Sequence, residues 1–148
     1  MAIFFMETTR IAPERTVGEI QMILAQHGAK AVLLEFDGKK VSAVSFQYTV
    51  NGRDIPFRLP CRWTFIEQML KDNGRRPRYD DTLELWARRV AWRQILRWVQ
   101  AQLALVETSM VKIQEVFLPY VVTHSGQTIY ELQEKKNFGL LMPGKEGL

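Results

Sequence analysis

Residues 31–36 form a short apolar run, and from residue 44 to 50 and again from 55 to 59 apolar residues occupy every second position, which is the pattern of strands that bury one face of a sheet. Val44, Phe46 and Tyr48 fall on the apolar side of this alternation. The pattern predicts strands over residues 31–36, 41–50 and 55–59.

Two dipeptides separate these strands, Asp37-Gly38 and Asn51-Gly52. Both tolerate the positive dihedral angles of type I′ turns, so each indicates a two-residue hairpin. Pro56 has no backbone N–H to donate, so we expect the third strand at the edge of the sheet. Residues 3–6 are a candidate fourth strand.

Helical spacing of apolar residues dominates the rest of the chain. Thr16 and Glu19 form a capping-box sequence for a first helix that Gly28 ends. A short helix is predicted over 62–70. A second capping sequence, Asp81 with Glu84, begins a long pattern that reaches Leu118.

The long pattern contains a heptad seam over residues 92–117. Its members are Trp92, Leu96, Val99, Leu103, Val106, Met110, Ile113 and Phe117. One straight helix of this length would be long for so small a protein. We therefore expect either a break near Thr108-Ser109 or a protruding helix through which a homodimer forms.

These elements predict an α+β fold: an N-terminal helix, an antiparallel meander of three to four strands, and a long C-terminal helix or helix pair packed on the sheet. Residues 120–130 are expected to form a small hairpin or loop. We expect one domain over 1–134 and a loosely ordered tail over 135–148.

Composition supports a folded protein, with 148 residues, 47% hydrophobic and 24% charged. The only cysteine, Cys61, excludes an intramolecular disulfide. No apolar run approaches the ~20 residues of a membrane span. We expect a cytoplasmic protein of a bacterial host cell that does not act at a membrane.

Candidate catalytic chemistry is sparse. His27 is expected to interact with the last carbonyls of the first helix, and His124 lies in a predicted turn. Basic neighbours could lower the pKa of Cys61, although a small buried hydrophobe is the favoured interpretation. No metal motif, cofactor motif or converging carboxylates are present, so we expect no metal, no cofactor and no enzymatic activity.

The charge of the chain is concentrated between Arg62 and Trp98. Nine basic against five acidic residues give this stretch a net +4, which equals the net charge of the whole chain, and all four tryptophans lie in it. Arginine beside aromatic rings can bind phosphates and stack on bases. The candidate binding residues are Arg75, Arg76, Arg78, Arg89, Arg93, Arg97, Arg58, Trp86 and Trp63.

Three interpretations of this cluster remain open. The arginines could contact a phosphodiester backbone, with Arg89, Arg93 and Arg97 forming one row along a helix. They could bind an acidic protein surface. They could also pair with carboxylates of the chain itself and have only a structural role.

The chain resembles a family of small, uncharacterised proteins of bacteriophages, prophages and other mobile elements. The resemblance lies in Glu14-Arg15-Thr16, Ile55-Pro56-Phe57-Arg58-Leu59-Pro60, Arg88-Arg89-Val90-Ala91-Trp92-Arg93 and Glu115-Val116-Phe117-Leu118-Pro119-Tyr120. It implies a phage-type protein encoded among replication and recombination functions, and it supplies no catalytic residues. The order of elements also resembles that of double-stranded-RNA-binding domains, which is an analogy of fold alone.

Two functions follow as expectations. The first is a non-catalytic nucleic-acid-binding accessory protein of DNA replication or recombination, with DNA favoured over RNA. The alternative is a protein-binding inhibitor or adaptor, such as an anti-defence protein, that uses the same basic patch. A hydrolase that uses Cys61 or a histidine is a third and weaker hypothesis.

Overall fold

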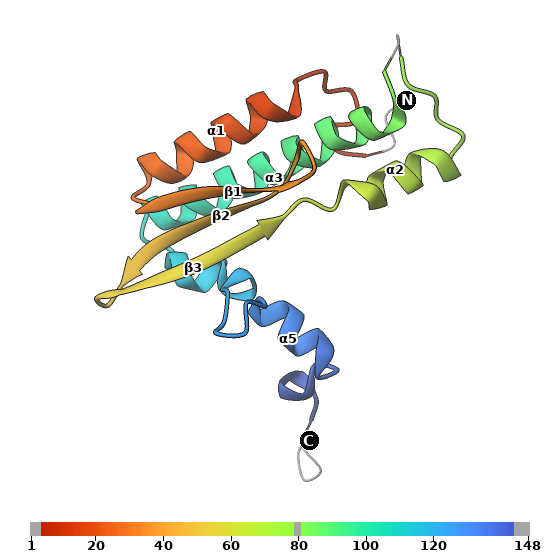
Figure 1. Cartoon of the computed structure of the whole chain (residues 1–148). Helices are drawn as coiled ribbons and strands as arrows, with labels where there is room; N and C mark the ends of the chain where they lie inside the picture. The colour runs from red at the N-terminus through yellow and green to blue at the C-terminus, as the bar shows by residue number, and fades with distance from the viewer. Residues whose placement is uncertain (1–3, 79–80, 144–148) are drawn as a thin grey trace.

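The computed structural model describes residues 4–78 and 81–143 and shows an α+β fold (Figure 1). A three-stranded antiparallel sheet is followed by a long helix that packs on it together with the first helix. The elements in chain order are α1 (Pro13–Gln26), β1 (Ala31–Asp37), β2 (Lys40–Val50), β3 (Arg53–Pro60), α2 (Trp63–Asp72), α3 (Leu83–Glu107), α4 (Ile113–Val116), η1 (Leu118–Tyr120), α5 (Ile129–Lys135) and η2 (Gly139–Leu141).

The meander has the order β1-β2-β3, as the alternating pattern predicts. The β2–β3 turn is the expected one, since Val50 pairs with Arg53 across Asn51-Gly52, and both turn residues have positive φ. The first turn differs by one residue. Asp37 pairs with Lys40, so the loop residues are Gly38 and Lys39.

Pro56 fits the edge position of β3 for a physical reason. Its carbonyl accepts a hydrogen bond from the backbone N–H of Val122, so this residue's backbone faces away from β2. An N–H at Pro56 would point the same way, so the proline removes no bond of the β2–β3 ladder.

The core lies between the sheet and helices α1 and α3. Phe46 and Phe57 stack with their ring centroids 5.1 Å apart, and Phe117 meets both rings edge-on. Ile20 of α1 and Trp92 of α3 are fully buried against this cluster. The apolar side of the alternating strand pattern is therefore the face that the helices cover.

Both predicted capping sequences are displaced. Helix α1 begins at Pro13, whose fixed φ suits the first helical position, so Thr16 lies buried inside the helix. Helix α3 is capped by Thr82, whose hydroxyl accepts from the N–H of Leu85 at 3.1 Å. Asp81 does not cap the helix and instead forms an ion pair with Arg89.

The long helical pattern is interrupted where a break was expected. Helix α3 ends at Glu107, and Ser109 adopts a left-handed conformation with φ +63°. The first four seam residues, which lie in α3, are buried in the core of the chain: Trp92, Leu96, Val99 and Leu103 are at most 1% exposed. Over residues 92–103 the seam therefore presents no exposed apolar row to a second copy, and homodimerisation through it stays a prediction that this packing weakens.

The C-terminal part extends away from the sheet (Figure 1). Val122 forms an isolated bridge with Thr128, which fits the predicted small hairpin. Helix α5 was not predicted, although Thr128 and Glu131 form a capping box that is visible in the sequence. The expected loose tail contains the end of α5 and η2 as far as residue 143, and the rest of it lies outside the described residues.

No strand forms at the N-terminus within the described residues, where 4–8 make a turn. This segment is held against α3 instead. The side chains of Trp86 and Gln94 donate hydrogen bonds to the carbonyls of Glu7 and Phe5, at 2.8 and 2.9 Å. Over the residues described, none of the helices combines the length and apolarity that crossing a membrane would require.

Candidate nucleic-acid interface

The predicted arginine row on α3 is largely engaged inside the molecule. Arg93 is buried and donates to Glu19 of α1 at 2.9 Å. Arg89 makes a forked contact with Asp81, at 2.7 and 3.4 Å. Arg97 is the exposed member and bonds only to Gln100 among the described residues. The structure therefore does not assemble these three side chains into one open row for a phosphate backbone.

The two tryptophans expected to stack on bases already have cationic partners. Trp63 is 8% exposed, and the guanidinium of Arg88 lies 5.9 Å from its ring centroid. Trp86 is partly buried, and Arg75 lies 5.9 Å from its centroid. Each of these rings therefore already has a cation beside it.

Arg58 is separated from the other candidates. It projects from the polar face of β3 and donates to the carbonyl of Gly126 at 2.9 Å and to Glu131 at 3.2 Å. It therefore fastens the C-terminal part to the sheet. The hydrogen bonds of Thr128 and Arg58 hold the pKa of Glu131 below its ordinary value, against an opposing effect of burial.

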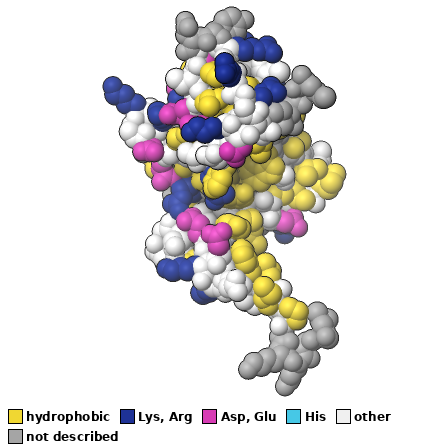
Figure 2. All heavy atoms as spheres, turned by 90° about the vertical axis from the view of Figure 1, so that its right-hand side faces the viewer, with side chains coloured by type: hydrophobic (Ala, Val, Ile, Leu, Met, Phe, Trp, Pro, Cys, Tyr) yellow, Lys and Arg dark blue, Asp and Glu magenta, His cyan; other side chains and the backbone are white. Residues whose placement is uncertain are grey.

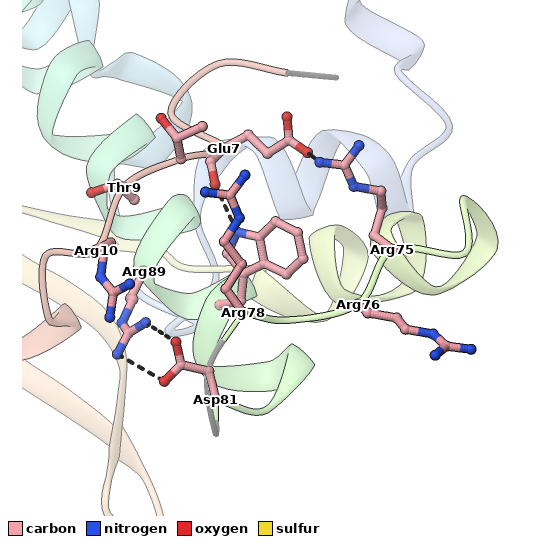
Figure 3. Close-up of a pocket in the computed structure, with 10 residues that line it drawn as sticks. Glu7, Thr9, Arg10, Arg75, Arg76, Arg78, Asp81 and Arg89 are labelled. Atoms are coloured by element: carbon pink, nitrogen blue, oxygen red, sulfur yellow. Dashed lines mark hydrogen bonds and ion pairs between the residues drawn. The ribbon is translucent and has the colours of Figure 1, made fainter. Parts of the chain in front are cut away.

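The other candidates meet at a hollow beside the first turns of α3 (Figure 3). Its volume is ≈ 100 Å³. The N-terminal segment supplies one wall, the loop after α2 a second, and α3 a third. The lining residues are Glu7, Thr8, Thr9, Arg10, Arg75, Arg76, Arg78, Asp81, Trp86 and Arg89.

Local sequence explains why the loop reaches this place. Gly74, with φ +63°, ends α2 in a left-handed conformation, and the N–H of Arg75 bonds back to the carbonyl of Leu70 at 2.9 Å. Pro77 then prevents a helical continuation. The opposite wall is held by Trp86, whose indole N–H donates to the carbonyl of Glu7.

The hollow carries an excess of positive charge. Five arginines line it against two carboxylates, an excess of three. Glu7, which is 2% exposed, pairs with Arg75, and Asp81 pairs with Arg89. The amino-terminal end of α3 adds the positive pole of a 25-residue helix. Arg76 and Arg78 are exposed and form no ion pair with another described residue.

The two views place this charge at one end of the molecule. Figure 2 shows Lys and Arg side chains gathered over the upper half of one face, with acidic side chains among them. In Figure 3 the side chains of Arg10 and Arg89 lie close to one another, whereas Arg76 points away from the hollow. A small concave surface, rather than the length of α3, is therefore the best-formed basic feature.

Sequence reasoning missed the N-terminal members of this site, of which Glu7 and Arg10 are charged. Both lie far along the chain from the arginine-rich stretch, and the N-terminus was expected to pair with the sheet. A lone acidic residue in the apolar start of the chain was the available signal, because a buried carboxylate needs a cationic partner.

The residues considered for catalysis have structural surroundings. Burial raises the pKa of the Cys61 thiol to about 12, despite its basic neighbour Arg88. The thiol is buried, which agrees with the favoured interpretation of a small buried hydrophobe. The ring of His27 contacts the carbonyl of Ile23 at 2.9 Å, as a helix-end residue should. Among the described residues no three His, Cys, Asp or Glu side chains form a group that could hold a metal ion.

Comparison with known proteins gives no relative from which a function could be transferred. No family model matches the chain, and neither the curated proteins nor the solved structures contain a significant match to it.

Proposed function

We propose that this protein is a non-catalytic nucleic-acid-binding accessory protein that contacts phosphates through the arginine hollow. The observation that carries the proposal is the excess of positive charge among the residues that line this hollow. Guanidinium groups suit phosphate oxygens because their planar N–H forks bind two oxygens at once. The phage-type role in DNA replication or recombination is part of the same proposal.

The internal ion pairs sharpen the choice of binding residues. Arg93 and Arg58 hold α1 and the C-terminal part in place, so they support the fold and are not the first contacts of a ligand. Arg10, Arg76 and Arg78 are exposed at the rim, and Arg97 is exposed further along α3. Phosphate contact by these groups would be electrostatic and independent of base sequence.

Fluorescence anisotropy with labelled single- and double-stranded DNA and RNA tests this proposal. We expect binding at low salt. The logarithm of the association constant should fall linearly with the logarithm of the salt concentration. Arg78→Glu should weaken binding by about tenfold or more and reduce the salt slope by about one.

The matched control is Arg53→Glu. Arg53 is the exposed first residue of β3, beside the β2–β3 turn, which lies at the opposite end of the sheet from the hollow (Figure 1). Reversal of its charge changes the net charge equally. An equal loss of affinity in both variants would show that only overall charge matters. Absence of binding to every oligonucleotide at tens of micromolar would overturn the proposal.

One observation favours a second candidate function, a protein-binding inhibitor or adaptor. Phe65 and Met69, one helical turn apart on α2, are 70% and 44% exposed and precede the arginine loop. Exposed apolar side chains beside arginines are typical of protein interfaces. Under this function, a Phe65→Ser/Met69→Ser variant would lose a protein partner that the wild type captures, and oligonucleotides would not bind.

A further inference from the structure

We infer that the hollow takes a phosphomonoester, the terminal phosphate of a nucleic-acid strand, in preference to an internal phosphodiester. This inference rests on the proposed function and deepens it by naming the chemical group that the site recognises. Three features of the hollow carry it: its size, the excess of positive charge among its lining residues, and the guanidinium that already lies beside Trp86.

Size is the first feature. Pockets that enclose a drug-sized molecule have volumes of about 300–1,000 Å³. The hollow, at ≈ 100 Å³, is well below this range. It can admit one small charged group and cannot enclose a whole nucleotide. A strand would therefore insert an end, with its sugar and base left outside.

The excess of positive charge is the second feature. Arg10, Arg75, Arg78 and Arg89 line the hollow from the N-terminal segment, the loop and α3. In Figure 3 Arg10 and Arg89 lie beside one another, whereas Arg75 is directed toward Glu7. With Glu7 and Asp81 subtracted, these four leave an excess of two positive charges. A phosphomonoester carries about 1.5 to 2 negative charges at pH 7, whereas each phosphodiester carries one.

A row of separate contacts would instead suit an internal backbone. The structure does not provide that row, because Arg89 and Arg93 are held by Asp81 and Glu19. Only Arg97 remains exposed along this line of α3. This line of α3 therefore does not present a row of exposed arginines to a strand.

The third feature concerns bases. Arg75 occupies a face of Trp86, and the indole N–H of Trp86 is already bonded to Glu7. The hollow therefore offers charge and N–H donors, and a cation already lies beside the ring of Trp86. Recognition should depend on the phosphate and be indifferent to the base that follows it.

Competition anisotropy with one DNA sequence in three forms tests the inference: 5′-phosphorylated, 3′-phosphorylated and with hydroxyls at both ends. We expect a phosphorylated end to increase affinity about tenfold or more at low salt. Arg78→Glu and Arg10→Glu should abolish that preference, while Arg53→Glu should retain it. Arg78→Lys, which keeps the charge but loses the fork, should reduce the preference partially.

The outcomes separate the inference from the function on which it rests. Equal affinity for all three forms would overturn the inference and leave nucleic-acid binding intact. Binding of a nucleoside monophosphate without binding of any oligonucleotide would support phosphomonoester recognition and overturn the proposed function. Absence of binding to oligonucleotides, mononucleotide and inorganic phosphate would overturn both. Circular dichroism of each variant verifies that it is folded.

Discussion

Arg93 holds a positive charge on a side chain that is only 6% exposed. Its partner Glu19 lies on α1, 74 residues earlier in the chain, and is 37% exposed. The pair therefore joins the two helices that cover the sheet. At the scale of single residues, most arginines of α3 contact carboxylates of the chain itself and so contribute to the fold.

Removing Glu19 should show how much the Glu19–Arg93 ion pair contributes to stability. Glu19→Ala leaves the buried guanidinium without its carboxylate, so we expect the free energy of unfolding to fall by about 1–3 kcal/mol, less than for a fully buried pair because Glu19 reaches solvent. Urea denaturation measures the change. Arg93→Met, which removes the charge and keeps the volume, should cost less.

Arg15 supplies the control for this measurement. It lies 3.6 Å from the same carboxylate but is 74% exposed. Arg15→Ala should therefore change the free energy of unfolding by less than about 1 kcal/mol. A loss as large as that of Glu19→Ala would contradict the assignment of the stabilising contact to Arg93.

Cys61 gives a second test at this scale. With its pKa raised to about 12 by burial, the thiol is neutral at pH 8 and shielded from reagents. We expect very slow reaction with a disulfide reagent in the native protein and rapid reaction in urea. Fast native labelling with a plateau near pH 8 would show instead an accessible thiolate and would reopen nucleophilic chemistry.

At the scale of elements, the break after α3 decides the architecture. The chain leaves the helix at Thr108 and turns through Ser109, whose φ is +63°. A non-glycine residue is strained in this region, and helices commonly end with glycine there. The turn lets Phe117 fold back to Trp98, with ring centroids 5.3 Å apart.

Ser109→Gly should therefore stabilise the protein. We expect the free energy of unfolding to rise by about 0.5–1 kcal/mol, since glycine adopts this φ without strain. Thermal and urea denaturation measure it. Thr108→Gly is the matched control and should destabilise, because Thr108 has φ −83° and bonds to the carbonyls of Ala104 and Leu105. A loss of stability in Ser109→Gly would argue against the left-handed turn.

The same elements show what sequence could and could not predict. The meander was predictable because period-2 alternation and Asn51-Gly52 are local signals. The break near Thr108-Ser109 was predictable from length alone. Ion-pair partners were not, because Glu19 and Arg93 meet only when α1 packs on α3. Helix α5 had a local signal, the capping pair Thr128 and Glu131, which was overlooked because residues 120–130 were interpreted as a hairpin or loop.

At the scale of the whole molecule, the fold pairs some arginines of the basic stretch with carboxylates and places others around one small hollow. The sheet, α1 and α3 bury the apolar seam and pair its neighbouring arginines, while Arg58 fastens the C-terminal part. Five arginines line the hollow formed by the N-terminal segment, the loop after α2 and the start of α3, while Arg62 and Lys71 are exposed outside it. The sequence was sufficient to predict that the loop from Arg75 to Arg78 belongs to the candidate interface. It was not sufficient to predict that Glu7 and Arg10 lie there too.

The most direct test of this account is to follow the four tryptophan indole N–H signals by nitrogen-15 NMR during titration with an oligonucleotide. Assignment is made by single Trp→Phe substitutions. The account predicts that the Trp86 signal shifts first and saturably, because this indole lines the hollow, while the core signal of Trp92 stays unchanged. An unchanged Trp86 signal together with shifts at Trp98, or with shifts of no indole at all, would contradict the placement of the phosphate site.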